Sequence, residues 1–375
     1  MAKITLEHIT KTFGKKTALS DVSLTVNDGE FLVLFGPAGA GKTTLLNMIA
    51  GIADPDSGNI WFDDTPMNFV EPRIRNVSMV FENYALYPQM TVYDNIASPL
   101  RSKMYRKEEA EIQQEVERVA RITGMEDYLN RKPSQLSNGQ RQRVALCRAL
   151  VRNPNVFLLD EPIAHLDAKL RNAMRKELKL MQKNFACTTI YVTHDFAEAM
   201  SLGDRIAVIR DGEIIQVGTN EEVYYRPSEE FVAKLFGECE INIIPAHIEE
   251  REGEKWAVTE WNNMEFRVPE DVSKELGEIV NVDLGCRTMA ISFARKPAEG
   301  LVKGSVYSVE PLGNKTELIV SIDGNLIRFI IPVEEKFHMD EELYIGLRPE
   351  HIIFFDQDTQ KFLGVHTEES KGVQL

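Results

Sequence analysis

A glycine-rich segment between an apolar run and a helix places the strongest constraint on this chain. The run Phe31–Phe35 is apolar throughout. The residues that follow it are Gly36, Pro37, Ala38, Gly39, Ala40, Gly41, Lys42, Thr43 and Thr44. The spacing G-x-x-x-x-G-K-T between a strand and a helix is typical of a loop that binds phosphate groups. Its glycines let the backbone curl until several N–H groups meet one anion at the positive end of the helix.

We therefore predict that residues 36–44 bind a nucleoside triphosphate. In this interpretation Lys42 reaches the β- and γ-phosphates, and the Thr43 hydroxyl is a ligand of Mg²⁺. The alternative is a glycine-rich turn that has this spacing by chance.

The composition indicates a globular protein of more than one domain. A chain of 375 residues is long for one hydrophobic core, so we expect two or three domains. No apolar run approaches the roughly 18 residues that span a bilayer, and residues 1–5 lead directly into strand-like sequence without a secretory signal. Four cysteines are scattered without metal-ligand spacing, namely Cys147, Cys187, Cys239 and Cys286. Reduced thiols of a cytosolic protein are the simplest interpretation.

Charge is distributed unevenly along the chain, whose net charge is −15. From Ile241 onward there are 14 Lys and Arg against 25 Asp and Glu, which is a net charge of −11. An acidic surface repels phosphate backbones, so we expect no nucleic-acid partner for this part.

Two carboxylates follow a second apolar run. Residues 156–161 read Val-Phe-Leu-Leu-Asp-Glu, and a continuously apolar strand fits a parallel sheet that is buried on both faces. Ligands of such sheets bind at the carboxyl ends of the strands. Alone, two acids after a strand more often begin a helix. Beside the glycine-rich loop, we expect Asp160 to hold Mg²⁺ and Glu161 to polarise the water that attacks the γ-phosphate.

A third motif predicts the start of a helix. Ser137 and Gln140 have the spacing of a capping box. A helix N-terminus that carries a hydroxyl and a glycine is also suited to bind an anion. A well-capped helix without a ligand is the alternative interpretation.

The order of the motifs resembles that of a known family. Along the chain come the glycine-rich loop, Leu-Ser-x-Gly-Gln, the strand with Asp-Glu, and Thr-His-Asp at residues 193–195. This set resembles the ATP-binding cassette (ABC) ATPases over about the first 235 residues. The resemblance implies two cassettes head to tail, with each ATP held between one glycine-rich loop and the signature helix of the other subunit. It assigns that signature to Ser137, Asn138, Gly139 and Gln140.

The resemblance also assigns three single positions. Phe13 matches the aromatic residue that stacks on adenine, with a buried strand phenylalanine as the alternative. His194 matches the histidine that contacts the γ-phosphate and tunes the catalytic Glu161. Asp167 matches the loop that crosses the dimer interface, and we expect it to order that loop rather than to perform chemistry.

Two positions depart from the family pattern. Glu82 stands where the family has a glutamine that contacts Mg²⁺ and links the sheet to the helical subdomain. Asn138 stands where the signature usually has glycine. If both substitutions are neutral, the chain forms a homodimer. Otherwise it pairs with a different ABC ATPase, and the two composite ATP sites are unequal.

Hydrophobic periodicity and turn signals predict the remaining elements of residues 1–236. Apolar residues at helical spacing, such as Ile112 and Val116, predict an inserted helical subdomain at about 88–150. The aromatic run at 84–90 matches the groove that, in the family, receives a coupling helix of a membrane subunit, and core packing is the alternative. Asp-Gly at 211–212 predicts a hairpin. We expect one helix through Glu222–Phe236 to close the domain.

From residue 237 the pattern changes to short alternating strands. Asp-Gly-Asn at 323–325 predicts another hairpin. The segments 285–287 and 346–350 echo each other and suggest a duplicated barrel element, with a chance similarity as the alternative. Many short strands with turn signals suggest one or two small β-barrels of the OB type. On residues 231–237, 241–242 and 346–351, this tail resembles the regulatory domain of ATPases from carbohydrate importers, which implies an OB/TOBE-like regulatory domain.

The sequence thus predicts two domains. Residues 1–236 form an α/β P-loop NTPase of the ABC cassette type, with a mixed sheet and the inserted helical subdomain. Residues 237–375 form an all-β regulatory domain.

The family resemblance implies the ATP-hydrolysing subunit of an importer for a sugar or a polyol, with ATP and Mg²⁺ as ligands. Its expected partners are a second ABC ATPase subunit, transmembrane permease subunits and, indirectly, an extracytoplasmic solute-binding protein. The expected location is the cytoplasmic face of the membrane. The alternatives are a non-transport ABC ATPase acting on nucleic acid or the ribosome, and a nucleotide-dependent regulatory protein.

Overall fold

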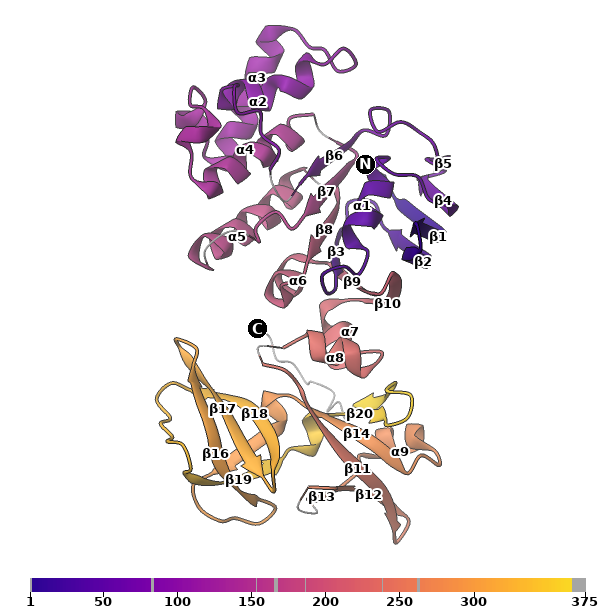
Figure 1. Cartoon of the computed structure of the whole chain (residues 1–375), viewed down its shortest axis with the longest axis vertical. Coiled ribbons are helices and arrows are strands. Elements are labelled where there is room, and N and C mark those ends of the chain that lie inside the picture. Colours follow the sequence, from indigo (N-terminus) through magenta and orange to yellow (C-terminus); the bar gives the residue numbers. More distant parts are fainter. Residues whose placement is uncertain are drawn as a thin grey trace. The chain divides into compact units, whose positions relative to one another are not determined.

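The computed structural model describes residues 2–81, 84–152, 154–164, 168–185, 187–237, 239–261 and 264–365 (Figure 1). The chain divides into two compact units, Met1–Asn220 and Glu221–Leu375. Among the described residues, no helix is long and apolar enough to cross a membrane.

A six-stranded sheet forms the centre of the first unit. Its strand order is β10-β9-β3-β8-β7-β6. The strands are β3 (Phe31–Phe35), β6 (Val77–Val80), β7 (Val156–Asp160), β8 (Thr188–Thr193), β9 (Arg205–Arg210) and β10 (Glu213–Gly218). All neighbours pair in parallel except β10, which pairs with β9 in the antiparallel direction. The sheet is therefore mixed, as predicted.

The parallel register brings three strand ends together. Strands β3, β7 and β8 are buried along their whole length, as expected for strands covered on both faces. Phe35 of β3 lies opposite Thr193 of β8, and Asp160 of β7 lies opposite Val192. The chain therefore leaves all three strands at one edge of the sheet.

A second sheet of the first unit is antiparallel, with the order β2-β1-β4-β5. Its strands are β1 (Ile4–Phe13), β2 (Lys16–Val26), β4 (Ser57–Phe62) and β5 (Thr65–Pro66). Helix α1 (Lys42–Ala50) lies between the two sheets (Figure 1). One hydrophobic core contains Leu6 of β1, Leu45 of α1 and Leu158 of β7. The helix that follows the glycine-rich loop is thus held by both sheets.

A buried arginine holds the far end of α1. The Arg75 guanidinium donates to Met48 O at 2.7 Å and to Ile49 O at 3.1 Å, in the last turn of the helix. It also donates to Met67 O at 2.6 Å and to Val70 O at 2.9 Å, in the connection before β6. A cation at a helix C-terminus satisfies carbonyls that lack partners there and interacts favourably with the helix dipole.

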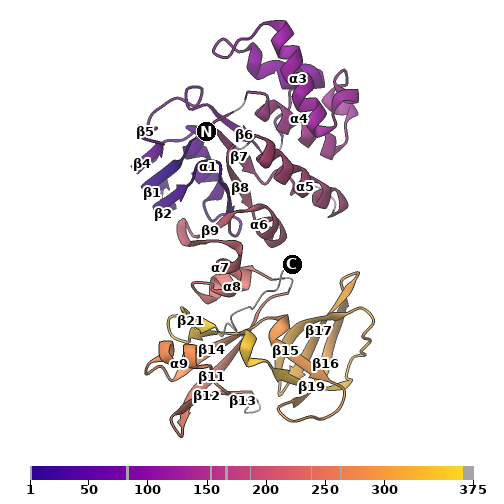
Figure 2. The ribbon, with the colours of Figure 1, turned by 180° about the vertical axis from the view of Figure 1, so that it is seen from behind.

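Three helices form a region beyond the edge of the sheet (Figures 1 and 2). They are α2 (Val92–Ala97), α3 (Glu109–Thr123) and α4 (Asn138–Leu150). Ile112 and Val116 of α3 are buried, as their spacing predicted. Thr123 Oγ1 lies 3.0 Å from Cys147 Sγ, a contact that joins α3 to α4. Two further helices, α5 (Ala168–Phe185) and α6 (Phe196–Leu202), precede and follow β8.

Two antiparallel sheets form the second unit, with the orders β13-β12-β11-β14-β20-β21 and β15-β19-β16-β17-β18. The first contains β11 (Asn242–Arg251), β12 (Glu254–Thr259), β13 (Glu265–Arg267), β14 (Asn281–Cys286), β20 (Ile352–Asp356) and β21 (Phe362–Val365). The second contains β15 (Ile291–Ala294), β16 (Val302–Pro311), β17 (Lys315–Ile322), β18 (Asn325–Pro332) and β19 (Glu342–Leu347). The two sheets share one hydrophobic core with helix α9 (Glu270–Leu276).

The internal echo of the tail corresponds to a repeated structural element. Strand β14 leads through a 3₁₀ turn at Thr288–Ala290 into β15, and β19 leads through one at Pro349–His351 into β20. Strand β14 pairs with β20, and β15 pairs with β19. Each copy therefore crosses from one sheet to the other beside its counterpart. The two echoing segments thus share a strand–turn–strand structure, while the predicted barrel stays a prediction.

Both predicted hairpins are present. Asp211 and Gly212 join β9 to β10, and Asp323 and Gly324 join β17 to β18. All four residues have positive φ, which two-residue turns of type I′ require.

The single helix predicted over Glu222–Phe236 is wrong. Two helices occupy this stretch, α7 (Asn220–Tyr225) and α8 (Glu230–Leu235). Pro227 lies between them. Proline lacks an N–H group and disfavours the helical conformation of the residue before it, so the helix ends there.

Helix α8 packs within the second unit. The Glu230 N–H donates to Gln360 O at 3.0 Å, and Ala233 shares a hydrophobic cluster with Phe355. This packing explains why the compact units divide after Asn220, ahead of the boundary that the sequence suggested at 236.

Two buried carboxyl groups join α8 to β14. Glu230 and Asp283 are both buried, and Lys234 Nζ donates to Glu230 Oε2 at 2.7 Å. Burial, and after it a hydrogen bond with the Glu230 carboxyl group, raises the pKa of Asp283 to about 6. Gln357 Nε2 donates to Asp283 Oδ1 at 3.4 Å and opposes the rise. The raised pKa thus favours the protonated form of Asp283 in this buried environment.

We expect Asp283→Asn to stabilise the chain at pH 8 and to have little effect at pH 4. The folded-state pKa lies above the unfolded value, so protonation stabilises the fold at low pH, and this contribution is lost as the pH rises through about 6. Asparagine resembles the protonated acid but does not titrate, so the gain at pH 8 should be about 1–3 kcal/mol. Urea unfolding of the full chain at both pH values measures the change, with the exposed Asp358→Asn as the control. The same pH dependence in both variants would contradict the raised pKa of Asp283.

Candidate active site

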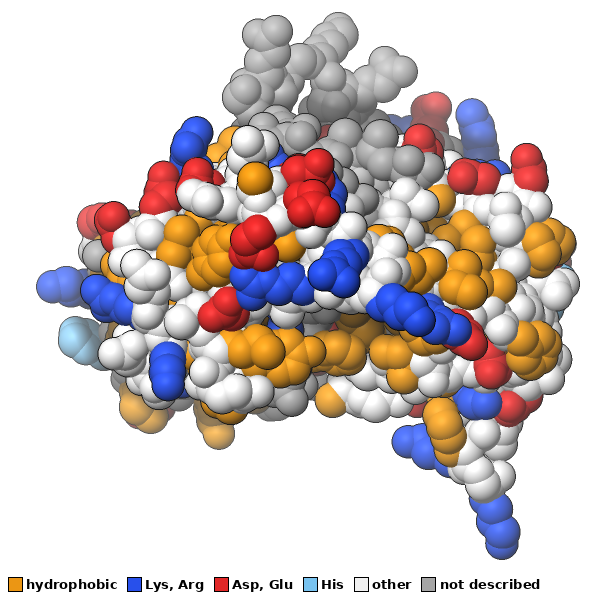
Figure 3. Space-filling model, turned by 90° about the horizontal axis from the view of Figure 1, so that it is seen from above, with side chains coloured by type: hydrophobic (Ala, Val, Ile, Leu, Met, Phe, Trp, Pro, Cys, Tyr) orange, Lys and Arg blue, Asp and Glu red, His pale blue; other side chains and the backbone are white. Residues whose placement is uncertain are grey.

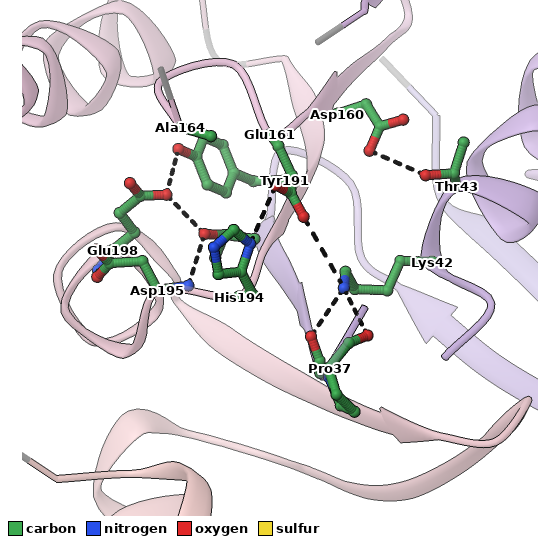
Figure 4. Close-up of polar contacts among 12 residues, drawn as sticks. Pro37, Lys42, Thr43, Asp160, Glu161, Ala164, Tyr191, His194, Asp195 and Glu198 are labelled. Carbon is green, nitrogen blue, oxygen red and sulfur yellow. Dashed lines mark hydrogen bonds and ion pairs between the residues drawn. The ribbon is translucent and has the colours of Figure 1, made fainter. Parts of the chain in front are cut away.

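Three loops at one edge of the central sheet carry the candidate residues. The loops follow β3, β7 and β8, whose carboxyl ends meet at this edge. The residues that the fold brings together are Lys42, Thr43, Asp160, Glu161 and His194. Figure 4 shows their side chains turned toward one shared space. The sequence predicted all five, and the parallel register explains why they meet.

Two glycines of the first loop leave no room for a side chain. A Cβ at Gly36 would lie 2.2 Å from a carbonyl oxygen of β9, and one at Gly41 would lie 2.6 Å from Ala18 O. The first hydrogen bond within α1 runs from the Leu45 N–H to Gly41 O at 3.0 Å. The N–H groups of residues 42–44 precede this bond, and they are donors that phosphate oxygens suit. Of the other predicted residues, Thr44 lies in the first turn of α1. The turn that leads into the helix contains Pro37, Ala38, Gly39 and Ala40.

Lys42 is buried at the start of α1. Its Nζ donates to Gly36 O at 2.8 Å and to Pro37 O at 2.9 Å. It also lies 4.0 Å from Glu161 Oε1. Burial lowers the pKa of Lys42, and the carboxylates of Glu161 and Asp160 oppose that fall. A triphosphate bound beside this ammonium would add negative charge and so favour its charged form.

Thr43 and Asp160 offer oxygen ligands side by side. The Thr43 hydroxyl donates to Asp160 Oδ1 at 3.3 Å, between α1 and the end of β7. Oxygen ligands suit Mg²⁺, which at nucleotide sites takes further ligands from phosphates and water. In the part of the chain that the structure describes, no group of three or more His, Cys, Asp or Glu side chains could hold a metal ion. Thr43 and Asp160 thus offer two adjacent oxygen ligands of the kind that suits Mg²⁺.

Glu161 stands on a strained backbone. Its φ is 44°, a left-handed value that is uncommon for residues other than glycine and is often found at functional sites. The Glu161 N–H donates to Val192 O at 3.1 Å, and the Ala164 N–H donates to Glu161 O at 3.3 Å. These bonds hold a tight turn from which the carboxylate points toward Lys42 (Figure 4).

His194 contacts the other oxygen of this carboxylate. Its Nδ1 lies 3.0 Å from Glu161 Oε2, and 60% of the His194 side chain is exposed. An imidazole in this position can orient the carboxylate and remain accessible to a ligand. Glu161 therefore faces an ammonium group on one side and an imidazole on the other.

Sequence reasoning missed the residues that support His194. The hydroxyl groups of Thr193 and Tyr191 donate to Glu198 Oε2, at 2.7 and 2.9 Å. Burial raises the pKa of Glu198, and these two donors oppose the rise. Asp195 caps α6 by accepting from the Glu198 N–H at 3.0 Å. The spacing of Asp195 and Glu198 is typical of a helix start, and this signal could have identified the support.

The signature residues begin α4, as the capping box predicted. Ser137 Oγ accepts from the Gln140 N–H at 3.3 Å, and Gln140 Oε1 accepts from the Ser137 N–H at 2.9 Å. The Asn138 side chain accepts from Arg141, and Gly139 is buried in the first turn. Helix α4 lies in the helical region, whereas α1 lies beside the sheet (Figures 1 and 2). The role of the signature in a partner's site stays a prediction.

Three other predicted residues have roles that this geometry leaves as predictions. Phe13 ends β1 and is 55% exposed, which excludes the buried-strand alternative but does not test adenine stacking. Glu82 and Asp167 lie outside the described residues.

Comparisons with known proteins agree with this geometry. Residues 19–164 match the family model described as ABC transporter. The trehalose/maltose import ATP-binding protein MalK of Thermococcus litoralis is 42% identical over 376 residues, which cover 96% of this chain and 99% of the relative. The chain belongs to the ABC transporter family.

Other members of the ABC family extend the comparison. The sulfoquinovosyl glycerol transport ATP-binding protein SmoE of Agrobacterium fabrum is 39% identical over 365 residues, which cover 96% of this chain and 99% of the relative. A solved dimer of an ATP-binding cassette in a post-hydrolysis state, bound to ADP and phosphate, is 33% identical with a TM-score of 0.53. That match covers 58% of this chain and 98% of the solved chain. The ABC cassette fold of the first unit is therefore confirmed.

We expect Lys42→Ala to weaken the binding of ATP to this ABC protein about tenfold or more, equivalent to about 1.4 kcal/mol or more. The substitution removes the ammonium group that the loop carbonyls hold beside Glu161. The phosphates of ATP would then lack a positively charged hydrogen-bond donor. Titration with a fluorescent ATP analogue measures the affinity. Lys176→Ala, at an exposed lysine of α5, is the control. An affinity equal to that of the control would refute the assignment of the loop.

Proposed function

We propose that this chain is the ATP-hydrolysing subunit of an importer for a sugar or a polyol. The proposal rests on the contact of Glu161 with both Lys42 and His194, which combines a general base with groups suited to phosphate. The names of the relatives support the solute class, because they refer to trehalose, maltose and sulfoquinovosyl glycerol. These names also favour transport over the nucleic-acid and regulatory alternatives.

The proposed reaction is the attack of water on the γ-phosphate of ATP. Lys42 binds the β- and γ-phosphates, with the N–H groups of residues 42–44 around them. Glu161 accepts a proton from the attacking water. His194 orients the Glu161 carboxylate and reaches the γ-phosphate.

Further residues complete the proposed nucleotide and metal ligands. Phe13 stacks on the adenine ring from the exposed end of β1. Thr43, Asp160 and Glu82 are the proposed ligands of Mg²⁺, which neutralises phosphate charge when it is bound. The adjacent oxygens of Thr43 and Asp160 support this assignment.

A second subunit completes each ATP site in this proposal. Ser137 and its neighbours Asn138, Gly139 and Gln140 bind the phosphates of the ATP that the partner holds, at the N-terminus of α4. Asp167 orders the loop between the subunits. The solved cassette dimer with ADP and phosphate supports such an arrangement. The partner is either a second copy of this chain or a different ABC ATPase.

Transmembrane permease subunits are the proposed partners of the loop before α2. Buried Asn95 holds Tyr87 from both sides, because Oδ1 accepts from the Tyr87 N–H at 2.8 Å and Nδ2 donates to Tyr87 O at 3.0 Å. Arg148 of α4 donates to Tyr84 O at 2.8 Å and to Ala85 O at 2.7 Å. The loop is therefore attached to the helical region, while the Tyr87 side chain stays exposed to a partner.

Exposed hydrophobic side chains support such a docking surface. Between β5 and α3 they are Phe69, Ile74, Phe81, Tyr87 and Met104. Figure 3 views the end of the molecule that carries α2 and α3, and hydrophobic side chains lie there beside Lys and Arg. A chain docked through this surface is a peripheral subunit at the cytoplasmic face of the membrane, and the solute-binding protein acts on it only through the permease.

The second unit is proposed as a regulatory domain of the OB/TOBE type over residues 237–375. Its two antiparallel sheets with one shared core, and the duplicated passage between them, support this interpretation. Helices α7 and α8 belong to the same compact unit and precede the domain in the chain.

We expect Glu161→Gln to lower the turnover of ATP about 10²- to 10⁴-fold while ATP still binds. Glutamine keeps the size of the side chain but cannot accept the proton of the attacking water. Phosphate release by the purified chain measures turnover, and nucleotide titration measures binding. Turnover equal to that of the wild type would remove Glu161 from its role. Hydrolysis by the chain alone would also show that it needs no different ABC ATPase as a partner.

We expect Tyr87→Asp to abolish co-purification of the chain with permease subunits expressed beside it. A carboxylate on the exposed ring position would be buried without a partner in a hydrophobic contact. Met339→Asp, at an exposed hydrophobic residue of the second unit, is the control and should retain the permease. Retention by both variants would exclude docking through Tyr87.

A further inference from the structure

We propose that Arg171 is a positioning residue for ATP hydrolysis, because it ties the turn after Glu161 to the turn after His194. The inference rests on the proposed function, since it concerns the same reaction. It adds a residue on α5, a helix to which neither sequence motif nor comparison assigned a part in the site.

The Arg171 guanidinium bridges two loops that are distant in the sequence. Its Nη2 donates to Ala164 O at 3.2 Å, and its Nη1 donates to Asp195 Oδ2 at 3.0 Å. Ala164 ends the turn that begins at Glu161, and Asp195 directly follows His194. One planar group with several donors in a fixed fork thus holds both loops.

On the first loop, this contact acts on a short and rigid turn. The Ala164 N–H donates to Glu161 O at 3.3 Å, and Ile163 between them is completely buried. Glu161 itself has the left-handed φ of 44°. Such a strained conformation persists only when its surroundings hold it. The bond from Arg171 to Ala164 O is one of those constraints.

On the second loop, Arg171 completes the support on one side of His194. Asp195 Oδ1 accepts from the Glu198 N–H of α6 at 3.0 Å, while Oδ2 accepts from Arg171 of α5. The Asp195 N–H donates to Thr193 Oγ1 at 3.0 Å, so the residues on both sides of His194 are linked. Arg171 Nε lies 3.9 Å from Glu198 Oε1, which extends the same network.

The reason that such support matters is the exposure of the His194 ring. With 60% of its side chain exposed, the ring is little constrained by packing, yet it lies 3.0 Å from the Glu161 carboxylate. The relative position of the two side chains therefore depends on their backbones. A misplacement of about 1 Å by a distant mutation can lower a reaction rate about 100-fold.

The test compares Arg171→Met with Lys176→Met in the full chain, by steady-state ATP hydrolysis. Lys176 is an exposed residue of the same helix, so its substitution removes the same charge from that helix. We expect kcat of Arg171→Met to fall about 10- to 100-fold while the KM for ATP changes by less than about twofold. Arg171→Lys should recover part of kcat, since lysine can keep one of the two contacts.

A second variant keeps the test decisive if Arg171→Met fails to fold. Asp195→Asn retains an oxygen that can cap α6 but removes the charged partner of Arg171, so we expect a smaller fall in kcat with an unchanged KM. In the double variant Asp195→Asn with Arg171→Lys, the fold decrease in kcat should be smaller than the product of the two single decreases. The reason is that both substitutions affect the same contact.

The inference would be overturned if Arg171→Met and Asp195→Asn both had the same kcat as the Lys176→Met control. A fall in kcat fully explained by fewer sites that bind a non-hydrolysed ATP analogue would also overturn it, because that result indicates lost folding. If the wild-type chain hydrolyses ATP and the variants match it, the proposed function stands and only the role of Arg171 fails. A wild-type chain that hydrolyses no ATP, with or without its partners, would remove both.

Discussion

Parallel pairing of β3, β8 and β7 is the constraint on which the site depends. The three strands are buried on both faces, so their side chains fix the register, and Phe35 meets Thr193 while Asp160 meets Val192. The chain leaves each strand at the same edge with a different chemical group. A glycine-rich loop, a pair of carboxylates and a histidine thereby meet although they lie far apart in the sequence.

Within this frame, the site combines strain with close support. Glu161 adopts a left-handed backbone conformation, and Lys42 is buried against loop carbonyls and two carboxylates. Such features are costly unless the surrounding core and hydrogen bonds hold them. This support comes from the core around α1 and from the hydrogen bonds of Arg75 to the last turn of that helix. The hydrogen bonds to Glu198 add to it. The candidate site residues are thereby held in place by the surrounding fold.

The second unit follows a different principle. Two copies of a strand–turn–strand element pair with each other and pass from one sheet to the other, so one core serves both sheets. Helix α8 packs on this unit, where Glu230 approaches Asp283 in a buried environment. Because the pKa of Asp283 is raised to about 6, the stability of this unit falls as the pH rises through that value.

Local requirements of the backbone determined much of this protein from sequence alone. Several features were predictable because each depends on neighbouring residues. They are the glycine-rich loop, the capping box at Ser137, both Asp-Gly hairpins and the acids at the end of β7. The break at Pro227 was equally local and was overlooked. Only the tertiary structure determined the contacts of Arg171, Arg75 and Glu198. Their partners are carbonyls, hydroxyls or carboxylates on distant segments. The spacing of residues in the sequence cannot predict such contacts, because they form only when the fold brings the distant segments together.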